Sequence, residues 1–475
     1  MIKFLEKTFR LSEAGTDIRT EVRGGAVTFM TMAYIIFVQP AVLGNAGMDK
    51  GAVMMATCIS AAVATLIMGL TANYPIALAA GMGENFIFVD VVKALAEPIK
   101  ETLIAQGVSA EEAARQAMAQ VWPTGLTVIL LSGILFILLS SFRFRERIMA
   151  AIPESLRHAI ATGIGLLIAF VGLRYSGLQL WGATPAENLG TLRGCRILSL
   201  FGLALISVLL ARGVRGAILI GVLVTAVVGV PFGLTKYPGG APLSVPPSIG
   251  PTLLKFDFAG IFTRIGIEMI FVFFLLDLFD TVGTLVAVGH QAGFVNGDGH
   301  LPRAGRAFMS DAIGTVVGAG LGTSTVTSYI ESAAGVAEGA RTGLANMVTA
   351  ALFILAIFFR PVVEMVGGGV FVGFTGPAPD VLYPAIAPVL LIIGALIMRS
   401  AARINWEDFT EAIPAFLTLI IMPLKLSITE GISAGFISYV ILKIMSGRAK
   451  EVKPLLCIFA VVFAVRGCLT LFGIL

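Results

Sequence analysis

Long apolar runs separated by short polar connections cover most of the chain. Many runs approach the roughly 20 residues that a straight helix needs to cross a bilayer. Others are shorter, which is typical of tilted or interrupted helices in transporters. The pattern predicts an all-α polytopic membrane protein with about fourteen transmembrane segments, at residues 24–45, 51–70, 76–96, 121–142, 152–173, 196–211, 216–235, 262–289, 306–322, 325–340, 343–361, 382–398, 411–428 and 430–446.

Basic residues mark alternate connections between these segments. Arg143, Arg145 and Arg147 follow the fourth segment and Arg212 follows the sixth, whereas the connection at 97–120 leans acidic. Because loops rich in Lys and Arg stay on the cytoplasmic side, the pattern places both main termini in the cytoplasm. We therefore predict a multi-pass protein of the cell membrane (inner or plasma membrane).

The two ends of the chain differ from the spanning segments. Residues 1–23 are basic and are predicted to be a cytoplasmic lead-in. Residues 454–475 are apolar but carry Arg466 in their middle. This stretch is either a fifteenth crossing or a helix that lies along the membrane interface, and the arginine favours the interface.

Composition supports the membrane assignment and excludes several classes of protein. Hydrophobic residues make up 57% of the chain and charged residues 13%, with a mean hydropathy of +0.93. A soluble domain carries about 25% charged residues. The net charge of +4 gives no support for nucleic-acid binding, and the four cysteines lack metal-ligand spacing. Without a Ser/His pair, a metal-ligand pair or a phosphate-binding loop, we predict no cofactor, no metal and no enzymatic activity.

Three acids stand inside apolar sequence. Asp277, Asp280 and Glu331 each cost about 2.5 kcal/mol or more at the centre of a membrane helix, so a functional role is the default interpretation. Asp277 and Asp280 are three residues apart and share one helix face. All three are candidates for carrying a coupling proton, although a helix cap or a bond to a nearby threonine is the alternative for the pair. Asp311 lies near a segment end, where a structural role is favoured.

The segment that leads to Glu331 is rich in Gly, Ser and Thr, which suits irregular backbone beside a cavity. A carboxylate at Glu331 can accept hydrogen bonds from the N–H edge of a heterocycle, unless the hydroxyls or Arg341 hold it. Tyr329 can stack on a planar ligand. Backbone N–H groups and hydroxyls near a helix start favour polar or partly negative atoms, and this segment offers them at Thr323, Ser324 and Thr325.

A glycine-interrupted segment in the first half, residues 76–90, resembles this one in position. It holds Gly83, Glu84, Asn85 and Phe86. The Asn85 amide can pair with a heterocycle edge, and Phe86 can stack on one. Glu84 faces either the same cavity or the opposite side. Paired interrupted segments in the two halves point to a transport site between inverted repeats.

Four stretches carry a family resemblance: TFMTMAYIIFVQP (28–40), ANYPIALAAGMGENF (72–86), DLFDTVGTL (277–285) and GTSTVTSYIESAAGVAEGARTGL (322–344). They resemble the AzgA-like purine permeases of the nucleobase–cation symporter family. The resemblance implies proton-coupled uptake of adenine, guanine or hypoxanthine by an elevator-like motion, in a homodimer. It also implies two inverted repeats of seven spans, with short strands in spans three and ten. A core domain is then expected at 24–142 and 262–361, and a gate domain at 143–235 and 382–446.

The resemblance also carries over site residues. The asparagine of the third span falls on Asn85, the acids of the eighth span on Asp277 and Asp280, and the glutamate of the tenth span on Glu331. Many members have an apolar residue where this chain has Glu84, so base preference or coupling can differ here. A carrier of uracil, xanthine or another small metabolite, or a passive channel, remains the alternative.

Overall fold

The computed structural model describes residues 2–141, 152–178, 189–294, 301–374 and 379–471. The first half of the chain forms helices α1 Ile2–Phe9, α2 Ile18–Met32, α3 Ile35–Gly44, α4 Lys50–Thr71, α5 Met82–Ala105, α6 Ala110–Ser141, α8 Glu154–Tyr175, α9 Leu189–Ala211 and α10 Ala217–Gly229. The second half forms α11 Arg264–Gln291, α12 Ala304–Leu321, α13 Ser332–Ala337, α14 Leu344–Ala356, α15 Arg360–Gly367, α16 Ala387–Ile397, α17 Phe409–Lys425, α18 Ile428–Met445 and α19 Pro454–Leu471. Short 3-10 turns lie at Val230–Phe232, Gly260–Phe262, Ile357–Phe359, Met398–Arg403 and Ala449–Glu451.

Each predicted segment coincides with one to three of these elements. Eight helical stretches within the described ranges are long and apolar enough to cross a membrane. The prediction of a largely helical, multi-span protein is confirmed, and the number of crossings stays a prediction. The arginines at 143, 145 and 147 that helped to set the topology lie outside the described residues.

The chain forms two compact units. One comprises residues 1–138 and 172–389, and the other comprises residues 139–171 and 390–475. The core and gate domains that the resemblance implies stay a prediction. Every residue of the candidate site belongs to the first unit.

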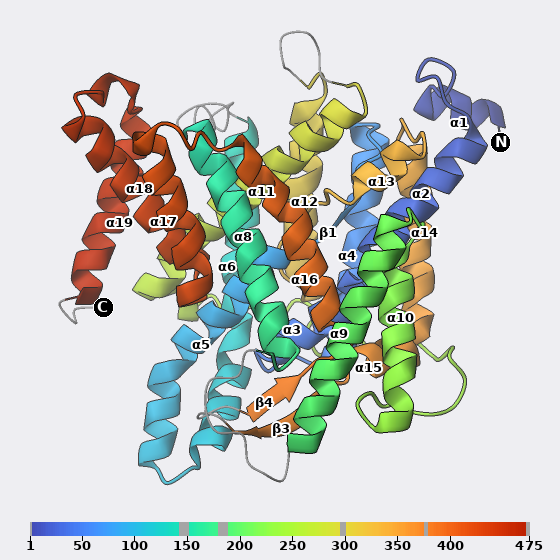
Figure 1. Ribbon diagram of the computed structural model, residues 1–475, viewed down its shortest axis with the longest axis horizontal. Coiled ribbons are helices and arrows are strands. Elements are labelled where there is room, and N and C mark those ends of the chain that lie inside the picture. Colours follow the sequence, from blue (N-terminus) through green and yellow to red (C-terminus); the bar gives the residue numbers. More distant parts are fainter. Residues whose placement is uncertain (1, 142–151, 179–188, 295–300, 375–378, 472–475) are drawn as a thin grey trace. The chain divides into compact units, whose positions relative to one another are not determined.

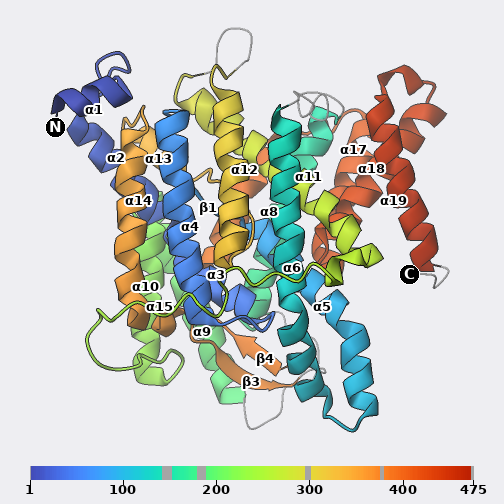
Figure 2. The same cartoon turned by 180° about the vertical axis from the view of Figure 1, so that it is seen from behind.

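Helices α2, α4, α12 and α14 lie side by side in the first unit (Figures 1 and 2). Glycines bring their backbones together: a Cβ atom added at Gly343 would lie 2.0 Å from the carbonyl oxygen of Gly69. A Cβ atom at Gly25 would lie 2.3 Å from the carbonyl oxygen of Ala345. Small residues at helix contacts are how membrane helices gain dispersion contacts without a hydrophobic driving force.

Two short strands pair within this unit. Strand β1 (Leu78–Ala80) pairs antiparallel with β2 (Val326–Ser328), with Ala79 opposite Thr327. Each strand precedes a helix, α5 after β1 and α13 after β2. The pairing satisfies backbone groups that would otherwise be costly away from water. The strands lie in the third and tenth predicted segments, as the resemblance implies.

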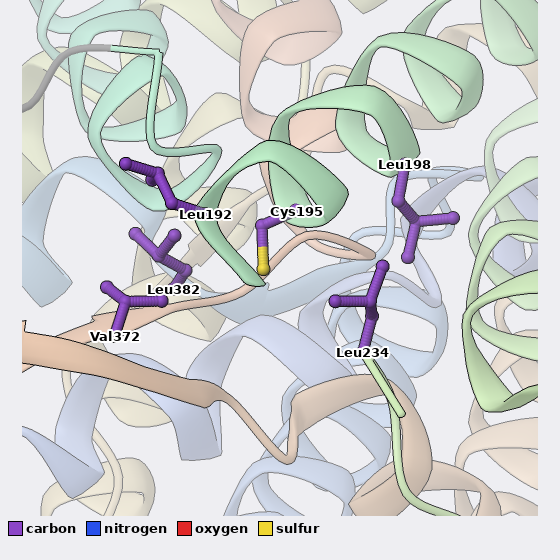
Figure 3. Close-up of a cluster of buried hydrophobic side chains, with 6 residues drawn as sticks. All are labelled: Leu192, Cys195, Leu198, Leu234, Val372 and Leu382. Atoms are coloured by element: carbon purple, nitrogen blue, oxygen red, sulfur yellow. The ribbon is translucent and has the colours of Figure 1, made fainter. Parts of the chain in front are cut away.

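A second strand pair was not predicted. Strands β3 (Val370–Phe374) and β4 (Pro379–Leu382) pair antiparallel, so the all-α prediction is wrong at this point. Val372 and Leu382 of the hairpin join a buried cluster completed by Leu192, Cys195, Leu198 and Leu234 (Figure 3). This burial stabilises a hairpin that a bilayer core could not accept alone.

The acidic stretch at 97–120 was predicted to be a connecting loop, but it is largely helical. Helix α5 continues to Ala105 and α6 begins at Ala110, with a turn at Gly107 whose φ is +88°. Residues 110–120 are rich in Ala, Glu and Gln, which are strong helix formers. The stretch is therefore a helical hairpin.

The C-terminal helix α19 runs antiparallel along α18 in the second unit (Figure 1). The Phe436 ring lies 6.2 Å from that of Phe459 and 6.1 Å from that of Phe463. Arg466 pairs with Glu430 of α18 at 3.1 Å. The placement of residues 454–475, as a fifteenth crossing or as an interfacial helix, stays a prediction.

An ion cluster joins the start of α17 to the end of α18. The Lys443 side chain is fully buried, and its Nζ lies 3.0 Å from Glu411 and 2.8 Å from Glu451. Arg448 pairs with Asp408 and Glu451 at 2.6 Å. We expect Lys443→Met to lower the apparent Tm of the purified protein by about 3–5 °C, because it removes the cation beside the partly buried Glu411 carboxylate.

Fluorescence-monitored unfolding checks this result, with Lys425→Met at an exposed position of α17 as the control. Hydrogen bonds from Arg448 and Lys443 hold the pKa of Glu451 at about 2. The cluster therefore stabilises the fold at neutral pH, and its contribution fades as the pH falls from about 4.3 toward that value. Equal Tm values for Lys443→Met and the wild type at pH 7 would contradict the role of the cluster.

Candidate functional site

Glu331 lies just after β2 and is half-buried. The Tyr34 hydroxyl donates a hydrogen bond to Glu331 Oε1 at 2.7 Å. Tyr34 itself occupies a break in the first predicted span, between α2 and α3. The alternative in which Arg341 holds this carboxylate is wrong, because the Arg341 guanidinium donates to the carbonyls of Val336 and Ala340.

Two tyrosine rings flank this carboxylate. The rings of Tyr34 and Tyr329 have centroids 6.4 Å apart and are tilted by 38°. The Tyr329 hydroxyl donates to the carbonyl of Ala80 in β1, at 2.5 Å. That bond ties the residue after one strand to the other strand, so both rings have fixed orientations.

The two aspartates of α11 have different surroundings. Asp277 is 1% exposed, and its Oδ2 accepts a hydrogen bond from Thr315 of α12 at 2.9 Å. Asp280 is half-buried, and the acids that interact with it electrostatically are Glu84, Glu331 and Asp311. The two aspartates therefore have different partners: Asp277 is bonded to α12, whereas Asp280 interacts electrostatically with Glu84 and Glu331.

Asn85 is fully buried in a network of side-chain amides and hydroxyls. Its amide donates to Gln39 of α3 and accepts from Ser324. The Gln39 amide donates in turn to Thr323 at 2.9 Å and to Ser324 at 3.0 Å. Asn85 thus joins α3, α5 and the segment before β2, and its carbonyl oxygen is engaged by the protein.

Thr325, which follows Ser324, is fully buried, and its hydroxyl has no hydrogen-bond partner among the described residues. A buried hydroxyl without a partner costs free energy, so such atoms mark places where a ligand or water binds.

Glu84 lies in the first turn of α5 and folds back onto it. A Cβ atom added at Gly81, the residue that precedes the helix, would lie 2.3 Å from Glu84 Oε2. A carboxylate at a helix start is favoured by the unpaired N–H groups and the helix dipole. Glu84 therefore stabilises the start of α5, while Gly83 and Phe86 are buried in the same part of the helix.

Sequence reasoning missed several residues of this region. Asp311 is fully buried on α12 beside Asp277, instead of lying at a segment end. Gln39 lies in the stretch 28–40 that carries the family resemblance, but nothing in the local pattern distinguished it from a packing residue. Within the described part of the chain, acidic, histidine and cysteine side chains form no group of three or more that could hold a metal ion.

The sequence profile of a permease family matches residues 19–376, which is most of the chain. The chain belongs to this permease family. The predicted family resemblance is confirmed, and so is the prediction that the protein is not an enzyme. The permease is accordingly a multi-pass membrane protein.

Named relatives extend the comparison. The permease is 40% identical to the adenine permease AdeP of Escherichia coli, with 97% of this chain and 95% of AdeP covered. It is 40% identical to the guanine/hypoxanthine permease PbuG of Bacillus subtilis, with 96% and 97% covered. Its fold is similar to the transmembrane domain of a cyanobacterial bicarbonate transporter, BicA, with a TM-score of 0.61 at 12% identity and 88% and 96% coverage.

Proposed function

We propose that the permease is a secondary active transporter that takes up adenine, guanine or hypoxanthine together with protons. The observation that carries this proposal is the convergence of Asp280 and Glu331, from two different elements, beside the β1–β2 pair and two fixed tyrosine rings. Purine bases offer N–H donors along their edges and flat aromatic faces. Carboxylates accept hydrogen bonds from these N–H donors, and tyrosine rings stack on the aromatic faces.

The base is held, in this proposal, by Glu331 and Asp280, with Tyr329 against its face. Thr325 supplies its unpartnered hydroxyl. Asn85, Thr323 and Ser324 fix the backbone around the base through their mutual hydrogen bonds. Gly83 and Phe86 at the start of α5 complete the surroundings.

Proton coupling rests on the acids in this unit, with Asp277, Asp280 and Glu331 as the carriers. A carboxyl group that binds a proton when the base binds links the two affinities reciprocally. Exchange between opposite-facing states then proceeds by elevator-like movement of a core domain against a gate domain. The antiparallel pairing of β1 with β2, each followed by a helix, supports two inverted repeats of seven spans. We further propose a homodimer in the cell membrane, with both main termini cytoplasmic.

Uptake of radiolabelled bases by cells that lack their own purine permeases tests the proposal. We expect accumulation of at least one of adenine, guanine and hypoxanthine, and its collapse when a protonophore is added. Replacing sodium in the medium should leave uptake unchanged. Uptake of uracil or xanthine alone would point to another substrate on the same fold, and conductance without proton dependence would point to a channel.

A further inference from the structure

Asp311 and Asp277 form a buried pair of acids. The family resemblance carries over only Asp277, and neither acid holds the base in the proposed site. Asp311 is 0% exposed and Asp277 is 1% exposed. The two carboxyl groups come from neighbouring helices, Asp311 from α12 and Asp277 from α11, and are close enough to interact electrostatically. Two carboxylates that lie close together in a buried site cannot both be ionised without strong repulsion.

The hydrogen bonds of the pair are incomplete in a specific way. Asp277 Oδ2 accepts from Thr315 at 2.9 Å, and Asp311 Oδ1 accepts from Ser328 at 2.9 Å. The other oxygen of each group, Asp277 Oδ1 and Asp311 Oδ2, is buried and has no donor among the described residues. A single proton placed between the two carboxyl groups supplies the missing donor to both sides at once.

The charged groups that face the pair from neighbouring elements are also acids. Glu84 of α5 faces both aspartates, and Asp280 of α11 faces Asp311. Strands β1 and β2 carry no titratable side chain, and α4, which packs along α12, carries only Lys50 at its start and Cys58. The surroundings therefore favour adding one positive charge to the pair.

The pair is also connected to the proposed base site. Ser328, which donates to Asp311, belongs to β2, three residues before Glu331. The Thr315 hydroxyl lies within hydrogen-bonding distance of both Asp277 Oδ2 and the carbonyl of Val326 in β2, at 3.1 Å from the latter. Repulsion between the two aspartates after loss of the proton would act directly on this strand.

We propose that Asp277 and Asp311 together hold the coupling proton, as a single shared proton, while Asp280 and Glu331 hold the base. That this proton is coupled to transport rests on the proposed function, whereas the sharing of a proton by the two carboxyl groups does not. Asp311 is a positioning and proton-holding residue, since it contacts β2 and Asp277 and not the base. The pair adds a fourth acid to the three that the sequence offered as proton carriers and assigns the proton to two of the four.

Base binding as a function of pH tests the assignment. Asp277→Asn and Asp311→Asn each leave an amide–carboxylate pair that imitates the singly protonated state without exchanging a proton. We expect the wild-type Kd for its preferred base to rise about tenfold per pH unit above neutrality, and to change less than twofold per unit in either variant. In proteoliposomes both variants should exchange base across the membrane but not accumulate it against a gradient. Asp280→Asn should weaken binding yet retain the tenfold pH dependence.

A second measurement does not depend on any base. The infrared C=O stretching band of a protonated carboxyl group should be present in the wild type at pH 7.5 and in Asp280→Asn, and absent at that frequency in both Asp277→Asn and Asp311→Asn. Tenfold pH dependence in the two variants, or its loss in Asp280→Asn alone, would overturn the assignment. Absence of any base binding by the wild type with the infrared band intact would instead refute the proposed substrate and keep the shared proton.

Discussion

Glu331→Gln should lower the affinity of the permease for its preferred base by about 100-fold, because a charge-assisted hydrogen bond contributes about 1.5–3 kcal/mol. The substitution keeps the shape of the side chain, and the amide oxygen can still accept from Tyr34. It removes the negative charge and replaces one acceptor oxygen by an N–H₂ donor. That donor would meet the N–H edge of the base, where no hydrogen bond can form.

Isothermal titration of the purified protein checks this result, and Glu338→Gln is the matched control. Glu338 stands seven residues further along, where it pairs with Arg23 and Arg215 and is remote from the strand pair. Its variant should bind the base within twofold of the wild type. Tyr34→Phe should fall between the two, with a loss of about fivefold, since it removes the hydroxyl that orients Glu331. Unchanged affinity in Glu331→Gln would show that the base does not contact this carboxylate.

The acids were visible in the sequence because a charge in an apolar run is expensive wherever it lies. Asp277, Asp280 and Glu331 could be selected on that ground, and the glycine-rich stretches beside them predicted interrupted backbone. The structure confirms that local irregularity: β1 and β2 lie where the two interrupted segments were predicted. The free-energy cost of a charge in an apolar run and the periodicity of hydrophobic residues are local properties, so both can be read from the sequence.

Partnerships between distant residues were beyond such reasoning. Asp311 was placed at a segment end because the segment was expected to begin at 306, whereas α12 begins at Ala304 and the carboxyl group is buried against α11. The β3–β4 hairpin gains its stability from Leu192, Cys195 and Leu198, more than 170 residues earlier in the chain. Neither contact can be predicted from the residues that neighbour it in the sequence.

Glu84 illustrates the same limit within a single turn. From the sequence alone, Glu84 was an acid that departs from the family pattern, and its side chain could face the site or the opposite side. The geometry shows both: its carboxylate folds back onto the start of α5, and its charge faces Asp277 and Asp280. The role depends on side-chain conformation, which spacing alone does not determine.

The Asn85 amide donates a hydrogen bond to Gln39 and accepts one from Ser324. Asn85→Leu should lower the apparent stability by about 2–3 kcal/mol and weaken the binding of every base by at least tenfold, because it leaves two fully buried polar partners unpaired. Gln39→Leu should have the same two effects, since it breaks the same network from α3.

Comparison of the two variants separates a supporting role from direct contact with the base. Adenine carries an amino group where hypoxanthine and guanine carry an oxygen, so an amide that touches this edge sets the preference between them. If Asn85 acts through the network, both variants should keep the wild-type ratio of affinities for adenine and hypoxanthine. The double variant should then cost less than the sum of the singles by about 1 kcal/mol or more, since both remove one shared interaction. A changed ratio in Asn85→Leu alone, with additive losses, would place the amide against the base, in an arrangement different from the one in which it bonds Gln39.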